Sequence, residues 1–478
     1  MRYACLLLTL IVAFTALGNV AQAADKKQPN ILFIFADDQC YETIGAFGHT
    51  EIQTPNLDTL VRDGLTFTHT YNQGSWSGAV CVASRTMLNT GRFIWHANRV
   101  YKDTEKEREQ GRFWSEIMKN AGYDTYFTGK WHVRADATKA FDYTAHVRGG
   151  MPKQTKEGYN RPHEDKPDVW SPYDRKFGGF WEGGKHWSEV VGDDAVGFLK
   201  DAAKRENPFF MYIAFNAPHD PRQSPKKFVD MYPLDRISMP LNFQPTYPNN
   251  ALIGCSPKLR DENLAPYPRT EYSVKVNRQE YYAIITHMDV QIGRILETLK
   301  STDQAKDTYV FFSADHGLAV GHHGLMGKQN MHEHSVRVPM MVVGPNVPAG
   351  EINSTQVYLQ DIMATTLDLA GVDKPGHVDF NSLMPLVRGE KVVPYDAIYG
   401  GYLTVQRAVT FGDYKMILYP KVPEVLLYNL KKDPHEMHNL YSQAKHKKTA
   451  KKLFAKFLEL QTQMGDELDL KTPFPELQ

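Results

Sequence analysis

Two pairs of neighbouring residues in this chain could bind a cation, although they lie almost 280 positions apart. Asp37 and Asp38 follow one short apolar segment, and Asp315 and His316 follow another. Both segments are apolar on both faces, as buried parallel strands are. Ligands in open α/β sheets bind beyond the carboxyl ends of the strands, so we expect all four residues to meet in one crevice.

Three carboxylates in one crevice would repel each other unless a cation lay between them. Hard oxygen ligands favour calcium or magnesium, and the flexible coordination of calcium leaves room for a substrate oxygen. His316 is more typical of a zinc or other transition-metal site. An isolated Asp37-Asp38 pair would more commonly form a solvated turn or a helix cap. Because other candidate residues accompany the pair, we expect one divalent cation here, with calcium preferred.

A cysteine supplies the candidate nucleophile. The segment Cys81-Val82-Ala83-Ser84-Arg85 precedes a helix predicted from Ser84 to Thr90, which Gly91 ends. A helix N-terminus offers free N–H groups and partial positive charge to an anion. As a plain thiol, Cys81 is a poor ligand for a hard metal, and a buried structural cysteine is the simpler alternative.

These segments resemble the motifs of the sulfatase family. Residues 81–85 match the site that sulfatases convert to formylglycine, and Gly122–His132 resembles the second motif of the family downstream of it. The resemblance covers about residues 29–385 in motif order and, more weakly, residues 427–436. It implies a type I sulfatase of the alkaline phosphatase superfamily. Ala83 stands where proline is commoner, which leaves open which maturation system acts on Cys81.

The resemblance implies a sulfuric ester hydrolase in which hydrated formylglycine 81 attacks the sulfur atom. His219, with Lys328 near it, protonates or neutralises the leaving alcohol, and His132 then takes a proton from the second hydroxyl so that sulfate departs. The implied catalytic residues are Cys81, Arg85, Lys130, His132, His219 and Lys328. The implied metal site, for Ca²⁺, consists of Asp37, Asp38, Cys81, Asp315 and His316. A formylglycine-generating maturation enzyme is the implied partner. His322 and His323 match no invariant position and are left outside the site.

A sulfated carbohydrate is the expected substrate. The segments 141–187 and 218–277 are predicted to be long loops, and the first carries aromatic side chains that could cover sugar rings among cations that could meet further sulfates. The aromatic residues are Trp170, Tyr173, Phe180, Trp181 and Trp187, and the cationic ones are Arg161, Lys166, Arg175, Lys176 and Lys185. The alternative is that these aromatic residues pack the loops together.

Other functions remain open. A phosphodiesterase or phosphonate monoester hydrolase of the same superfamily could use a similar metal and nucleophile. An aryl or choline-type sulfatase would differ only in the alcohol that leaves. A non-catalytic glycan-binding protein would require a broken site, and every residue that the family motifs require is present.

The N-terminus predicts export. Residues 1–23 combine Arg2, an apolar run and Ala21-Gln22-Ala23, which is the pattern of a cleaved signal peptide. The run is shorter than the roughly 20 residues that span a bilayer, so we expect a periplasmic or secreted protein without a membrane span in its mature chain. Its 55 basic and 55 acidic residues balance, which argues against a general nucleic-acid surface. Cys40 and Cys255 could pair or stay free.

Apolar strands alternate with amphipathic helices, which predicts an α/β fold with a large, mostly parallel sheet flanked by helices. Helices are expected over residues 54–64, 112–121, 188–203, 278–300, 357–370 and 445–463. We expect a catalytic α/β domain over residues 24–388. Residues 389–478, with strands at 405–411 and 414–419, are expected to form a smaller α+β subdomain.

Overall fold

The computed structural model describes residues 28–49 and 51–478, so the predicted signal peptide lies outside the described residues. A nine-stranded sheet forms its centre, in the order β10-β2-β8-β7-β1-β6-β4-β5 with β9 beside β2. The strands are β1 (Asn30–Ala36), β2 (Leu65–Tyr71), β4 (Asp124–Lys130), β5 (Tyr143–Arg148), β6 (Phe209–Ala214), β7 (Thr308–Ala314), β8 (Arg337–Val343), β9 (Glu351–Asn353) and β10 (Val357–Tyr358).

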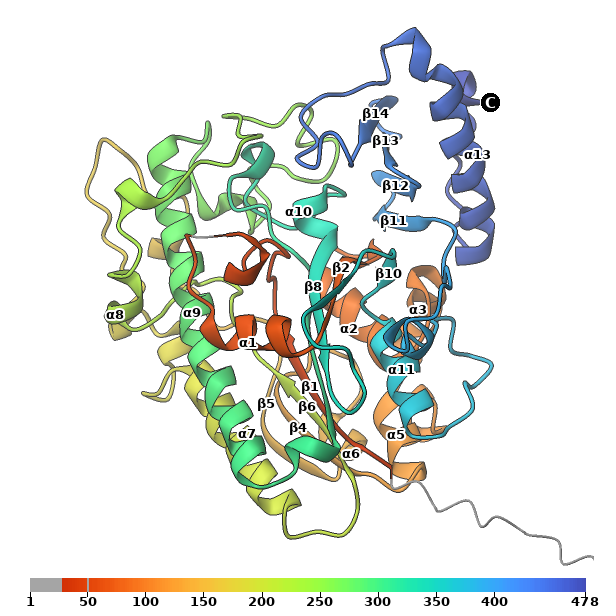
Figure 1. Cartoon of the computed structure of the whole chain (residues 1–478). Helices are drawn as coiled ribbons and strands as arrows, with labels where there is room; N and C mark the ends of the chain where they lie inside the picture. The colour runs from red at the N-terminus through yellow and green to blue at the C-terminus, as the bar shows by residue number, and fades with distance from the viewer. Residues whose placement is uncertain (1–27, 50) are drawn as a thin grey trace, which may run out of the picture.

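Helices cover both faces of this sheet (Figure 1). They are α1 (Pro55–Asp63), α2 (Val80–Thr90), α3 (Ile94–Val100), α4 (Thr104–Glu109), α5 (Trp114–Asn120), α6 (Ala137–Ala140), α7 (Trp187–Ala202), α8 (Lys226–Val229), α9 (Glu271–Ser301), α10 (Glu333–Val336), α11 (Asp361–Leu369), α12 (Met384–Val387) and α13 (Lys447–Met464). On one face, α9 packs against α1, α7 and α8, and on the other α5 contacts α2 and α11. The predicted α/β class is confirmed.

The central strands are apolar because both of their faces are covered. β1 lies between β6 and β7 and is parallel to both, and six of its seven residues are buried. Phe33 of this strand contacts the rings of Trp114 and Tyr212, at centroid distances of 5.3 and 4.9 Å. Replacing such a buried aromatic residue with alanine typically costs about 3–5 kcal/mol of folding free energy. This packing holds β1, and therefore the residues that follow it, in a fixed position.

A second sheet contains most of the C-terminal strands. It has five strands in the order β14-β13-β12-β11-β3, and α13 packs on it. The strands are β3 (Gly74–Ser75), β11 (Ile398–Tyr402), β12 (Gln406–Phe411), β13 (Tyr414–Tyr419) and β14 (Glu424–Asn429). β3 comes from the N-terminal half of the chain and pairs with β11. The smaller sheet therefore includes the segment that leads into α2. The domain boundary expected at residue 388 stays a prediction.

Several expected elements differ from the structure. The helix predicted from residue 357 begins only at Asp361, because Val357 and Tyr358 pair with β2 as an additional strand. The helix predicted from 278 begins at Glu271, where Thr270 and Ser273 form a capping box. β5 lies within the predicted loop 141–187 as an edge strand beside β4.

Within the described ranges, no helix is long and apolar enough to cross a membrane. Cys40, Cys81 and Cys255 are each free and buried.

Candidate active site

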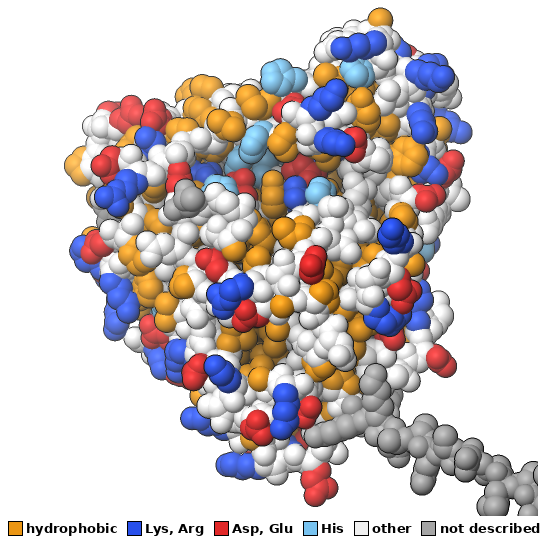
Figure 2. Space-filling model, viewed as in Figure 1, with side chains coloured by type: hydrophobic (Ala, Val, Ile, Leu, Met, Phe, Trp, Pro, Cys, Tyr) orange, Lys and Arg blue, Asp and Glu red, His pale blue; other side chains and the backbone are white. Residues whose placement is uncertain are grey.

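Four neighbouring strands deliver polar residues to one edge of the large sheet. Asp37 follows β1, Asp315 follows β7, Lys130 ends β4, and His219 lies five positions beyond the end of β6. These strands are consecutive in the sheet and parallel, so their carboxyl ends meet. The residues named here are buried; on the face drawn in Figure 2, other histidine, acidic and basic side chains lie near one another at the surface.

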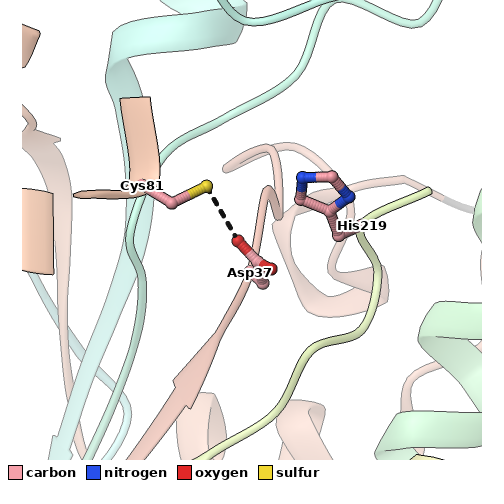
Figure 3. Close-up of side chains that lie close together, drawn as sticks. All are labelled: Asp37, Cys81 and His219. Carbon is pink, nitrogen blue, oxygen red and sulfur yellow. Dashed lines mark hydrogen bonds between the residues drawn. The ribbon is translucent and has the colours of Figure 1, made fainter. Parts of the chain in front are cut away.

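Cys81 lies in the first turn of α2 and faces these residues. Its Sγ atom is 3.2 Å from Oδ1 of Asp37, and His219 approaches from the opposite side (Figure 3). The helix begins at Val80, four residues earlier than predicted, and ends at Thr90; Gly91 follows it with a φ of 67°, the left-handed conformation that favours glycine. Burial, and then repulsion by Asp315 and Asp37, hold the pKa of the Cys81 thiol well above its usual range. Unmodified Cys81 is therefore a poor nucleophile in this setting.

Oxygen and sulfur atoms of four buried residues lie close enough to share one ion. Ligand atoms of Asp37, Asp38, Cys81 and Asp315 all lie within 4.8 Å of one another. Burial, and then repulsion by Asp315, raise the pKa of Asp37 to about 6, and burial also raises the pKa of Asp38 to about 6. A divalent cation would relieve this repulsion, and carboxylate oxygens are the ligands that calcium prefers.

His316 lies beside this group and not within it. Its Nδ1 atom is 3.0 Å from the carbonyl oxygen of Gly317, which makes Nδ1 the donor and leaves Nε2 as an acceptor. Nε2 is buried and has no hydrogen-bond partner in the part of the chain that the structure describes. Burial lowers the pKa of His316 to about 4, so the ring is neutral at neutral pH. A buried acceptor without a partner fits a metal ligand, and the role of His316 stays a prediction.

Three cations face the carboxylates. Nε of Arg85 donates to Asp315 at 2.9 Å, and the ammonium group of Lys130 contacts Asp37. Nζ of Lys328 lies 2.5 and 2.6 Å from the two carboxylate oxygens of Asp38 and 3.0 Å from Sγ of Cys81. All three side chains are buried. Fixed positive charges around a nucleophile position are what transfer of a sulfuryl group requires, because negative charge shifts among its oxygens as bonds change.

A neighbouring carboxylate orients His219. Its Nδ1 atom lies 2.9 Å from the carbonyl oxygen and 3.0 Å from the carboxylate of Asp220, so Nδ1 carries the donated proton. Nε2 faces the site, 3.5 Å from Asp38. Burial, and then Lys328, lower the pKa of His219, whereas Asp220 opposes this shift. Although burial disfavours a charged Asp220, Arg260 and His219 keep the pKa of Asp220 well below its usual range.

The site opens into a pocket of about 350 Å³. Besides Cys81, His132, His219 and Lys328, it is lined by Gly78, Ala79, Gly150, Met151, Leu259, Arg260, Asp261 and Gln329. His132 has a positive φ of 55° and packs against Gly150, where a β-carbon would approach its ring to 3.2 Å. Burial, and then Lys130, lower the pKa of His132 to about 2, so its imidazole is neutral and able to accept a proton.

Some lining residues escaped the sequence analysis. Asp220 and Gln329 had a usable signal, because they directly follow His219 and Lys328, but Arg260 lies in a loop without a motif. His322 and His323 are not among the residues that line the pocket. His322 pairs with Glu42 at 2.7 Å, and His323 stacks on His332 at 4.1 Å in a cluster that includes His334.

Most of the aromatic residues of segment 141–187, which could have covered sugar rings, pack within the protein instead. Phe180 stacks on His186 at 5.0 Å, and Arg161 lies over Trp170 while it bonds to Asp168 and Glu280. Trp170, Phe180 and Trp181 are buried, and none of the five aromatic residues lines the pocket. Tyr173 alone is more than a third exposed, at 41%. The interpretation that these residues hold the loops together is the one that fits.

Comparison with known proteins decides the family. The sequence profile described as Sulfatase matches residues 29–372, which is well over half of the chain. The chain belongs to the sulfatase family. A second profile, described as N-sulphoglucosamine sulphohydrolase, C-terminal, matches residues 321–463. The predicted enzyme class, a sulfuric ester hydrolase, is thereby confirmed.

Individual relatives agree with this sulfatase assignment. The N-acetylglucosamine-6-O-sulfatase of Bacteroides thetaiotaomicron is 26% identical over 96% of this chain and 91% of its own. A protein solved in complex with its substrate D-glucosamine-2-N,6-O-disulfate has a TM-score of 0.74 at 22% identity, covering 92% of this chain and 99% of the other. The phosphonate monoester hydrolase of Agrobacterium radiobacter has a TM-score of 0.68 at 21% identity, covering 91% and 96%. The solved structures show the shared fold alone.

Proposed function

We propose that this sulfatase hydrolyses a sulfate ester of a carbohydrate, with residue 81 as the nucleophile. The observation that carries the proposal is the placement of Cys81 Sγ beside Asp37, Asp38 and Lys328 at the base of a polar pocket. The carbohydrate is inferred from the 26%-identical N-acetylglucosamine-6-O-sulfatase, which the chain matches over nearly its full length.

Residue 81 must first be converted from cysteine to formylglycine by a maturation enzyme. Hydration of the aldehyde then gives two hydroxyl groups on one carbon. A cation such as calcium, held by Asp37, Asp38, Asp315 and His316, would favour the ionised form of one hydroxyl. That oxygen attacks the sulfur atom, while Arg85, Lys130 and Lys328 stabilise the negative charge on the sulfate oxygens.

One histidine of the site, His219, acts as a proton donor, and the other, His132, acts as a proton acceptor. His219, held by Asp220 through its Nδ1–H, must carry a second proton on Nε2 when the substrate is bound, and it gives that proton to the alcohol oxygen as the S–O bond breaks. His132, neutral in the free enzyme, accepts the proton of the second hydroxyl of residue 81. Loss of that proton allows the aldehyde to re-form and the sulfate to leave. One difficult hydrolysis is thus divided into two steps.

We also propose that residues 1–23 direct export and are removed, which would place the mature enzyme in the periplasm or outside the cell. A periplasmic or secreted enzyme would meet polymeric carbohydrates directly. Fractionation of the native host, with N-terminal sequencing of the mature chain, tests this proposal.

A substrate panel tests the function. N-acetylglucosamine 6-sulfate and other monosaccharide sulfates should be hydrolysed by the matured enzyme with a higher kcat/KM than nitrophenyl sulfate, choline sulfate, a phosphate diester or a phosphonate monoester. Preference for the phosphonate or the diester would assign the site to the alternative hydrolase class. Preference for the aryl or choline ester would exclude the sugar.

A further inference from the structure

A second groove lies beside the active-site pocket. It is formed by α3, the turn between β11 and β12, and the residues after α13, which lie near one another in Figure 1. Its volume is about 650 Å³, against about 350 Å³ for the active-site pocket. The lining residues are Trp76, Trp95, Asn98, Arg99, Leu403, Thr404, Val405, Arg407, Gly465, Asp466, Glu467 and Leu468.

Two half-buried tryptophans provide aromatic surface in this groove. Nε1 of Trp95 donates to the hydroxyl of Tyr399 at 2.7 Å, and the guanidinium of Arg407 lies 4.7 Å from the ring centre. Trp95 is therefore fixed before any ligand arrives. Trp76 packs against Tyr101 at 5.6 Å, and its Nε1 is buried without a hydrogen-bond partner among the described residues. Rigid aromatic faces bind ligands at a low cost in conformational entropy.

The charges of the groove cancel in pairs. Arg407 donates to Asp466 at 2.8 and 2.9 Å, and Arg99 lies 3.5 Å from Glu467. A polyanionic segment would find no unpaired cation in these two pairs. Asn98, Arg99 and Thr404 are exposed and offer donors and acceptors beside the aromatic faces. Apolar ring faces flanked by polar groups suit a neutral ligand with hydroxyl groups on its rim, which describes an uncharged sugar.

The groove adjoins the active-site pocket through a short piece of chain. Gly78 and Ala79 are exposed and line that pocket, and Trp76 lines the groove. Three residues of chain span at most about 11 Å, so the two sites are close. Gln329 donates to the carbonyl of Gly78 at 3.2 Å, and β3 fixes the preceding residues against β11.

We propose that the Trp76–Trp95 groove binds uncharged sugar residues of an oligosaccharide whose sulfated residue occupies the active-site pocket. The placement of the sulfated residue in the active-site pocket rests on the proposed function. Binding of uncharged sugars to the groove can be tested without catalysis. This proposal implies that the enzyme acts on an oligosaccharide and recognises the sugar residues next to the sulfate ester.

The binding experiment uses the mature full-length protein and neutral N-acetylglucosamine oligosaccharides of increasing length, followed by tryptophan fluorescence and calorimetry. Binding should tighten with length, and Trp76→Ala should weaken it about three- to tenfold, the effect of one aromatic contact. Thr404→Trp, which puts a large side chain at the exposed turn, should obstruct the groove and weaken binding similarly. Tyr272→Ala, at a 36% exposed tyrosine on α9 that lines neither site, is the matched control and should bind normally.

A kinetic experiment separates the groove from the chemistry. With sulfated N-acetylglucosamine oligosaccharides, the ratio of kcat/KM for the longest substrate to that for the monosaccharide sulfate should fall about three- to tenfold in Trp76→Ala. Absence of any length dependence in the unaltered enzyme, together with no binding of neutral oligosaccharides, would overturn the proposal. A dimer that Thr404→Trp disrupts would instead assign the groove to a second copy of the chain. Failure of the proposed function would appear separately, as no hydrolysis of any sugar sulfate.

Discussion

Nζ of Lys328 lies 3.0 Å from Sγ of Cys81. The same ammonium group is within 2.6 Å of both carboxylate oxygens of Asp38, so one cation links the nucleophile position to a predicted metal ligand. Burial opposes its charge, but Asp38 and Cys81 hold the pKa of Lys328 well above its usual range. Lys328 is therefore a fixed positive charge beside residue 81 across the pH range in which enzymes work.

The first prediction concerns the maturation of Cys81. The five-residue motif is intact, so the enzyme from its native host should carry formylglycine at residue 81, detected by mass spectrometry of the peptide that contains residues 81–85. Cys81→Ala should lower kcat on the order of 10⁴-fold or more, because it removes the nucleophile. Thermal unfolding should change little, since the small alanine side chain fits at residue 81 and Lys328 keeps its contacts with Asp38. Fully active native enzyme with an unmodified thiol would refute the mechanism.

The second prediction concerns the metal. The purified enzyme should contain one calcium per chain, measured by elemental analysis, and chelation should abolish activity until calcium returns. Asp315→Asn should lose the metal and at least about 100-fold of the activity. Asp289→Asn is the matched control, because Asp289 is also buried but accepts hydrogen bonds at the start of α1, and it should keep its calcium. Stoichiometric zinc would contradict the assignment and would point to His316.

The third prediction separates protonation from binding at His219. A sugar alkoxide needs a proton to leave, whereas nitrophenolate leaves well without one. His219→Ala should therefore lower kcat on a sugar sulfate by about 10²–10⁴-fold and lower kcat on nitrophenyl sulfate much less. Asp220→Asn, which keeps the shape but weakens the orienting contact, should show the same pattern at smaller magnitude. Equal losses on both substrates would mean that His219 only binds the sulfate.

Sequence reasoning locates the strand-end residues well. Asp37 and Asp315 each follow a run that is apolar on both faces, and such runs become central parallel strands whose carboxyl ends share one edge. The register of β1 and β7, which pairs Ala36 with Ala314, then brings Asp37 and Asp315 side by side.

Contacts that depend on loop paths are not predictable in this way. Arg260 reaches Asp220 from 40 positions away, and no local pattern marks that pairing. The loop aromatic residues had the composition of a sugar platform, yet Phe180 and Trp181 turn inward around His186. The hydrophobic periodicity of the sequence also gave no indication of β3, which is only two residues long. This strand joins a sheet whose other strands all lie beyond residue 397. In each case a contact between segments far apart in the sequence determined the structure, and the local sequence pattern did not indicate that contact.

The last prediction concerns stability against acid. Nδ1 of His186 accepts from the N–H of Ser188 at the start of α7, at 3.1 Å, and Nε2 donates to the carbonyl of Gln223 at 2.9 Å. Only the neutral ring with its proton on Nε2 can make both bonds. The ring is buried, 4.4 Å from that of His287 and near Arg148. Burial, and then His287, hold the pKa of His186 well below its ordinary value of 6.5.

Because the folded-state pKa is depressed, the unfolded chain takes up the proton first as the pH falls. The stabilising contribution of neutral His186 is therefore complete above pH 6.5 and is lost as the pH falls below it. One such group contributes a slope of about 1.4 kcal/mol of unfolding free energy per pH unit. Denaturant unfolding between neutral pH and pH 5 should show this slope, shared with other buried histidines. His186→Gln can make both hydrogen bonds without titrating, so its slope should be smaller by about one proton. His438→Gln, at an exposed histidine, is the control. An unchanged slope in His186→Gln would show that folding does not depress the pKa of His186.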